Sequence, residues 1–137
     1  MQIFQSSFGK FPSTSHGEVL RLARREFHKI QKRTPRRQAY VRSKYFRKDK
    51  IFVNQFWQHL GQKRAGDQVR RLRLYNCAID LIRNTSISPE TIFSKADSNL
   101  LLHRFAGKTK DNEPFIVQVK ENKRTGRKDF MSVFPSK

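Results

Sequence analysis

The clearest pattern in the sequence lies in Leu100–Pro135, which reads LLLHRFAGKTKDNEPFIVQVKENKRTGRKDFMSVFP. Apolar and polar side chains alternate in three short parts of it, a pattern typical of half-buried β-strands. The parts between them, GKTKDNE and NKRTGR, are polar and contain the Gly, Asn and Asp residues that favour turns. The sequence therefore predicts an antiparallel meander of three strands: Leu100–Ala106, Pro114–Glu121 and Lys128–Phe134.

The chain before this stretch has the features of helices. Ser15 and Glu18 have the spacing of a capping box, and the residues that follow separate into an apolar face and a basic face. Thr34-Pro35 is expected to end this first helix. We also expect helices over 36–49, Lys50–Leu60 and Asp67–Arg83, followed by a short strand at Thr91–Lys95.

Helices first and an antiparallel sheet last indicate an α+β fold. We expect N-terminal helices packed on a C-terminal sheet of three to four strands. The length of 137 residues suits a single domain. Its expected parts are an extended segment over 1–14, a basic helical part over 15–84 and the sheet over 90–135.

The chain is strongly basic: thirty Lys and Arg against eleven Asp and Glu give a net charge of +19. A field of this size favours a polyanionic partner, either nucleic acid or an anionic membrane surface. The basic helical surface has two readings: a solvated face, or a surface that contacts RNA phosphates and bases. The candidate RNA-binding residues are Arg21, Arg24, Arg25, Lys29, Arg36, Arg37 and Arg71.

The sequence argues against several other classes of protein. Its longest aliphatic run, Leu100–Leu102, is too short to cross a bilayer, and the first residues do not resemble a secretory signal. Cys77 is the only cysteine, which excludes an internal disulfide and favours a cytoplasmic setting. Histidines and acidic residues are scattered, and there is no glycine-rich phosphate loop. We therefore expect no metal, no other cofactor and no membrane partner.

The meander carries polar residues that a half-buried sheet does not require. Cleavage of RNA without a metal needs a base for the 2′-hydroxyl, an acid for the leaving 5′-oxygen, and donors that stabilise the phosphorane. An imidazole titrates near neutrality and can act as acid or base, a carboxylate can act as base, and cations or a hydroxyl can stabilise charge. The candidate catalytic residues are His103, Arg104, Lys120, Glu121 and Ser132.

Each of these five residues also has an ordinary structural reading, as a hydrogen-bonding or solvated side chain. Strand alternation places Val117 and Val119 toward the core and sends Lys120 outward. The register between strands is not determined by the sequence, so convergence of the five stays open.

Three pieces of the meander resemble the phage and mobile-element branch of the barnase–EndoU–colicin–RelE-like nucleases. That branch has a histidine strand, a strand ending V-x-V-K-E and a closing strand ending S-x-F-P. The matching pieces are His103-Arg104, Val117-Gln118-Val119-Lys120-Glu121 and Ser132-Val133-Phe134-Pro135.

The resemblance implies helices packed on an antiparallel sheet and a metal-independent, toxin-like endoribonuclease that forms a 2′,3′-cyclic phosphate. The implied partners are RNA, either tRNA or mRNA on the ribosome, and an acidic antitoxin or immunity protein. The alternative is a non-catalytic RNA- or DNA-binding module with the same fold.

Overall fold

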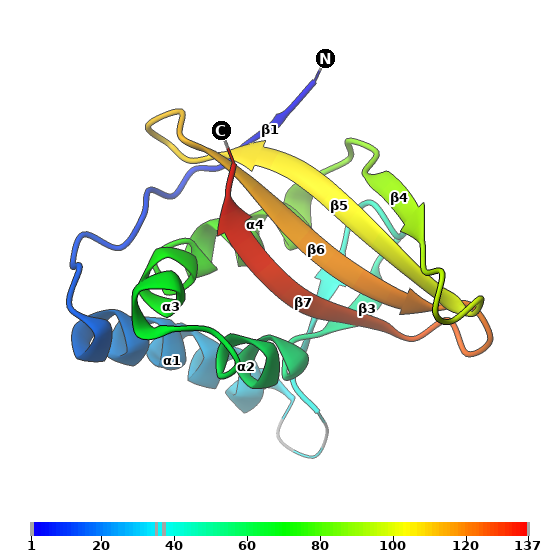
Figure 1. Cartoon of the computed structure of the whole chain (residues 1–137), viewed down its shortest axis with the longest axis horizontal. Coiled ribbons are helices and arrows are strands. Elements are labelled where there is room, and N and C mark those ends of the chain that lie inside the picture. The colour runs from blue at the N-terminus through cyan, green and yellow to red at the C-terminus, as the bar shows by residue number, and fades with distance from the viewer. Residues whose placement is uncertain (1, 35, 37, 137) are drawn as a thin grey trace.

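The computed structural model describes residues 2–34, 36 and 38–136. Within these residues, helices and strands are interleaved along the chain instead of following one another as two blocks (Figure 1). The elements are β1 (Phe4–Gln5), α1 (His16–Arg33), β2 (Tyr40–Ser43), β3 (Asp49–Phe52), α2 (Gln55–Leu60), α3 (Ala65–Leu72), α4 (Tyr75–Asn84), β4 (Glu90–Phe93), β5 (Leu100–Lys108), β6 (Pro114–Asn122) and β7 (Lys128–Pro135).

The seven described strands form one curled sheet, a half-barrel in which β5, β6 and β7 are the long central strands (Figure 1). The strand order is β1-β5-β6-β7-β3-β2. The remaining strand, β4, also pairs with β5, which therefore has β1 and β4 as well as β6 as partners. Two of the pairings, β1 with β5 and β3 with β7, are parallel. The predicted fold class, helices packed on a meander of three to four strands, is therefore wrong. The meander is present, but the N-terminal half extends its sheet with strands of its own.

The predicted helix over 36–49 is the largest local error, because this segment forms most of a β-hairpin. Tyr40–Ser43 pairs with Asp49–Phe52 in antiparallel register. Within β2, Val41 and Ser43 are buried and Arg42 is exposed, which is the alternation of a strand. Four residues are too few to separate a strand period from a helical one. The deciding contact is the pairing of β3 with β7, about 77 residues later in the chain.

Two other predicted helices are interrupted. The segment Lys50–Leu60 begins as strand β3 and becomes helical only at Gln55. The helix expected from Asp67 to Arg83 is broken between α3 and α4 because Leu72 and Leu74 are both fully buried. Two residues apart on one helix would point to opposite sides, so a change of direction lets both reach the core.

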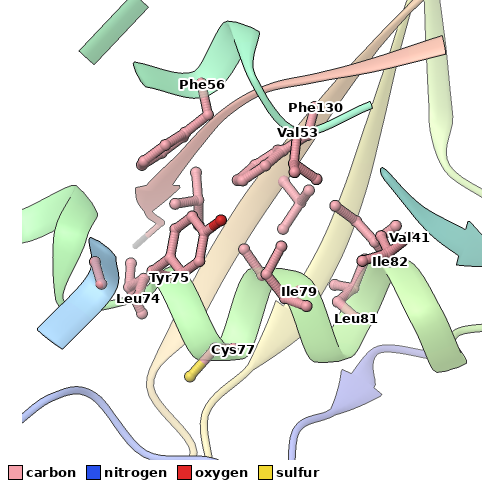
Figure 2. Close-up of a cluster of buried hydrophobic side chains, with 14 of the residues drawn as sticks. Val41, Val53, Phe56, Leu74, Tyr75, Cys77, Ile79, Leu81, Ile82 and Phe130 are labelled. Carbon is pink, nitrogen blue, oxygen red and sulfur yellow. The ribbon is translucent and has the colours of Figure 1, made fainter. Parts of the chain in front are cut away.

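The core lies between α4 and the inner face of the sheet, and Figure 2 shows the α4 side chains against Val41, Val53 and Phe130. At Gly107, an added Cβ would lie 2.8 Å from both Leu81 Cδ1 and Phe115 Cζ. Glycine at this position therefore lets α4 pack closely against β5.

The segment before α1 is largely extended, as expected, with Phe4 and Phe11 packed against the core.

The predicted capping box is not formed. Ser15 occupies the N-cap of α1 without a side-chain cap bond, and Glu18 accepts hydrogen bonds from Arg21 instead. Among the described residues, every helix is too short or too polar to cross a membrane.

Candidate functional site

The register of β5, β6 and β7 divides the five candidate catalytic residues between the two faces of the sheet. His103 stands opposite Val119 and therefore shares the inner face with Glu121. Arg104 stands opposite Gln118 and shares the outer face with Lys120. Ser132 also stands opposite Gln118, on the β7 side, and so shares its face of the sheet. Unlike the side chain of Arg104, that of Ser132 is buried. The structure thus brings together one pair, His103 and Glu121, and separates that pair from the other three candidates.

The pair is joined by a short hydrogen bond between His103 Nε2 and Glu121 Oε1, at 2.7 Å. The other ring nitrogen, Nδ1, lies 2.8 Å from the hydroxyl of Thr91, which faces His103 directly in the β4–β5 register. When Glu121 is ionised it can only accept, so Nε2 carries the proton. In a neutral ring, Nδ1 then accepts the proton of the Thr91 hydroxyl. The imidazole is therefore fixed in orientation by β4 on one side and β6 on the other.

A buried lysine, Lys128, extends this pair into a polar cluster. Its ammonium lies 3.9 Å from Glu121 Oε2, and it donates to Asp49 Oδ2 at 2.7 Å and to the carbonyl oxygen of Gly126 at 3.1 Å. The hydrogen bond from Lys128 lowers the pKa of Asp49 below its ordinary value. Lys128 lies on β7, which was predicted, and Asp49 lies on β3, which was not; the parallel pairing of these two strands brings them together.

The turn between β2 and β3 covers this cluster with an aromatic side chain. The ring of Phe46, in the turn between β2 and β3, lies 5.2 Å from the His103 ring and 5.0 Å from Lys128 Nζ. Tyr45 beside it packs edge-to-face on Phe105 at 5.5 Å. Both aromatic side chains are partly buried and packed against the core, so they do not form a free surface on which bases could stack.

The sequence contains a local signal for the pairing of Lys128 with Glu121. Glu121 and Lys128 flank the six-residue loop NKRTGR, and the register pairs them directly. Opposite charges at the two ends of a hairpin loop favour pairing across it. No comparable local signal points to Asp49 or Thr91, whose positions depend on tertiary pairing.

The basic surface of α1 is exposed, as expected for contact with a polyanion, but several of its cations are paired. Arg21 is 2.6 Å from Glu18 and Lys29 is 3.0 Å from Glu26. Arg25 lies 3.8 Å from the same Glu26 carboxylate. A shallow depression on this surface is lined by Arg21, Arg24, Arg25, His28, Lys29 and Lys32. Part of their charge is therefore neutralised within the helix.

The remaining candidate RNA-binding residues differ in accessibility. Arg24 is exposed and stacks over Trp57, with its guanidinium carbon 4.1 Å from the ring centroid. Arg71 is mostly buried, bonded to Asp67 at 3.2 Å and held over a phenylalanine ring of β7. Arg36 is exposed. Arg37 lies outside the described residues.

The described residues contain no group of three or more His, Cys, Asp or Glu side chains placed to hold a metal ion. What the inner-face cluster offers instead is an imidazole, a carboxylate and an ammonium group in contact, which are groups suited to proton transfer and charge stabilisation. Comparison with protein-family models, curated proteins and solved structures gave no match.

Proposed function

We propose that the chain is an endoribonuclease that cleaves RNA without a metal and leaves a 2′,3′-cyclic phosphate. The observation that carries this proposal is the contact of His103 with Glu121 at 2.7 Å, with the Lys128 ammonium beside the second carboxylate oxygen. Arg104, Lys120 and Ser132 lie elsewhere and have no part in the proposed chemistry.

In the proposed reaction, RNA enters between His103 and Glu121 and separates them. Glu121 takes the proton of the 2′-hydroxyl, and the 2′-oxygen attacks phosphorus. As the bond from phosphorus to the 5′-oxygen breaks, protonated His103 gives its proton to that oxygen. Lys128 stabilises the negative charge that develops on the phosphorane. Protons balance, because the carboxylate gains one and the imidazolium loses one.

The charge of the chain supports RNA as the substrate, since +19 attracts a polyanion to any exposed basic surface. The resemblance of the meander to toxin-like nucleases supports the same reaction. On that basis we propose a toxin-like role in the cytoplasm, with an acidic antitoxin or immunity protein as a neutralising partner.

The test is to incubate the purified protein with RNA in excess chelator. Glu121→Gln keeps the size of the side chain and removes its charge, so we expect a loss of rate of about 10²–10⁴-fold. The matched control is Lys120→Gln, the neighbouring residue on the outer face, which should keep the rate within about threefold. A substrate with a single 2′-deoxy nucleotide at the cleaved position should resist cleavage. Activity that requires added divalent metal, or that Glu121→Gln retains, contradicts the proposal.

A second candidate is an RNA- or DNA-binding module without catalysis. It is favoured by the burial of His103, which is 7% exposed with both ring nitrogens bonded, as expected of a residue that ties β4, β5 and β6 together. In that case the protein binds nucleic acid with strong salt dependence and does not cleave it. His103→Ala then lowers stability and leaves affinity unchanged.

A further inference from the structure

The turn between β2 and β3 has an unusual backbone. Arg47 and Lys48 both have positive φ angles, 56° and 68°. The amide of Asp49 donates to the carbonyl oxygen of Phe46 at 3.1 Å, so these two residues are the central positions of a β-turn. Two positive φ values are characteristic of a type I′ turn, in which Asn-Gly is the preferred sequence. Arg and Lys are disfavoured in this left-handed region, so the turn keeps two cations where stability favours other residues.

The two cations belong to a larger basic cluster, which we call the turn cluster. It lines a shallow concavity of about 520 Å³ together with the hydroxyl-bearing Ser43. Its cationic members are Arg42, Lys44, Arg47, Lys48 and Arg83.

The turn cluster differs from the basic surface of α1 in its lack of direct ion pairs. Among the described residues, none of its five cations lies within ion-pair distance of a carboxylate, whereas Arg21 and Lys29 of α1 do. The side chains of Arg42, Lys44, Arg47 and Lys48 are exposed. Carboxylates do lie nearby, because Asp49 interacts with Arg42, and Asp80 and Glu26 interact with Arg83, all beyond ion-pair distance. Concentrated positive charge that is not held in direct ion pairs is the arrangement that binds phosphate groups.

Arg83 forms the interior part of the cluster and belongs to the last turn of α4. It is half-buried, and burial together with nearby Arg33 lowers the pKa of its guanidinium. The backbone joins it to the turn, because the amide of Lys44 donates to the carbonyl oxygen of Arg83 at 3.3 Å. A half-buried guanidinium without a carboxylate partner has hydrogen-bond donors available for an anion.

The turn cluster is also next to the proposed reacting pair. Phe46, which directly precedes Arg47, lies with its ring 5.2 Å from the His103 ring. Asp49, which directly follows Lys48, accepts the hydrogen bond from Lys128. The same short turn therefore covers the reacting pair with one side chain and presents cations to solvent with the next two.

We propose that the turn cluster binds a backbone phosphate of the RNA strand next to the phosphate that is cleaved. This inference rests on the proposed ribonuclease function, which it deepens. It makes the substrate an oligonucleotide longer than a dinucleotide, because a dinucleotide has no second internucleotide phosphate to occupy the cluster.

The experiment measures binding separately from cleavage, with a fluorescent 2′-O-methyl oligonucleotide that cannot be cleaved. The variant is Arg47→Asn/Lys48→Gly, which removes two charges and introduces the sequence that the turn prefers. We expect its thermal midpoint to be equal to or higher than that of the parent. The slope of log K against log salt should fall in magnitude by about 0.7, the value for one lost phosphate contact on a single strand, equivalent to about fivefold weaker binding at 0.1 M salt.

The matched control is Lys108→Ala/Lys110→Ala, which removes the same charge at the far end of β5 from His103. It should leave the salt dependence within about 0.3 of the parent. In cleavage assays, the turn variant should lose rate on a hexanucleotide and keep it on a dinucleotide. A folded turn variant with unchanged affinity and salt slope overturns the inference. If the protein binds through the turn but cleaves nothing, the proposed reaction fails and the phosphate site stands.

Discussion

The ion pair between Lys128 and Asp49 should contribute measurably to stability, and Lys128→Met removes it while keeping an apolar stem of similar length. The Lys128 side chain is 10% exposed and its Nζ lies 2.7 Å from Asp49 Oδ2, but the Asp49 side chain is 47% exposed. A hydrogen bond to a charged group contributes about 1.5–3 kcal/mol, and water around Asp49 screens this one. The variant also leaves Glu121 without its nearby cation. We therefore expect a loss of about 2 kcal/mol.

The assay is urea unfolding of four proteins: the parent, Lys128→Met, Asp49→Asn and the double variant. The double-variant cycle isolates the interaction of the two side chains, and we expect a coupling free energy of about 1 kcal/mol at pH 7. Because Lys128 lowers the pKa of Asp49, this stabilisation is fully present above the unfolded pKa of Asp, about 4. It is lost as the pH falls through the lower, folded pKa.

The same cycle measured at pH 2 should therefore give a coupling near zero. The general repulsion of a highly charged chain at low pH cancels in the cycle, because all four proteins share it. A coupling below about 0.3 kcal/mol at pH 7, or one that persists undiminished at pH 2, would refute the role assigned to this pair.

Two further predictions concern the packing of α4. Gly107→Ala should destabilise the protein by about 1–3 kcal/mol in urea unfolding, because the new methyl group would overlap Leu81 and Phe115; a change below about 0.5 kcal/mol would show that α4 moves away freely. The thiol of Cys77 should resist iodoacetamide in the native protein and react in urea, because burial raises its pKa to about 11 and it donates to backbone carbonyl oxygens of the N-terminal segment. Equal alkylation rates in the two states would disprove its protection.

Local pattern was enough to predict the parts of the fold that depend on neighbours in sequence. The three strands of the meander, and the short strand before them, appear close to the expected positions. Their alternation correctly placed Val117 and Val119 in the core and Lys120 on the other face. The same alternation was sufficient to put His103 and Glu121 on one face, once the strand register was known.

The parts that the sequence did not reveal depend on pairing between distant segments. The hairpin of β2 and β3 joins the sheet through the pairing of β3 with β7. Each strand of the hairpin has only four residues, which is too short for its alternation to be recognised from the sequence alone. Asp49 and Lys128 are 79 residues apart in sequence, so their contact has no local signature. The five candidate catalytic residues were grouped by their nearness along the meander, and the two-residue period of a strand separated them.

The parallel pairing of β3 with β7 has a consequence for the order of events during translation. The hairpin of β2 and β3 emerges from the ribosome long before β7, the central strand with which it pairs in the described part of the chain, has been made. Until then the apolar sides of the hairpin, α1 and α4 lack the sheet that covers them, and pairing over such distances makes folding slow. Glu121 likewise lacks its neighbouring cation, Lys128. Until Lys128 has left the ribosome, the nascent chain therefore carries no completed cluster of His103, Glu121 and Lys128.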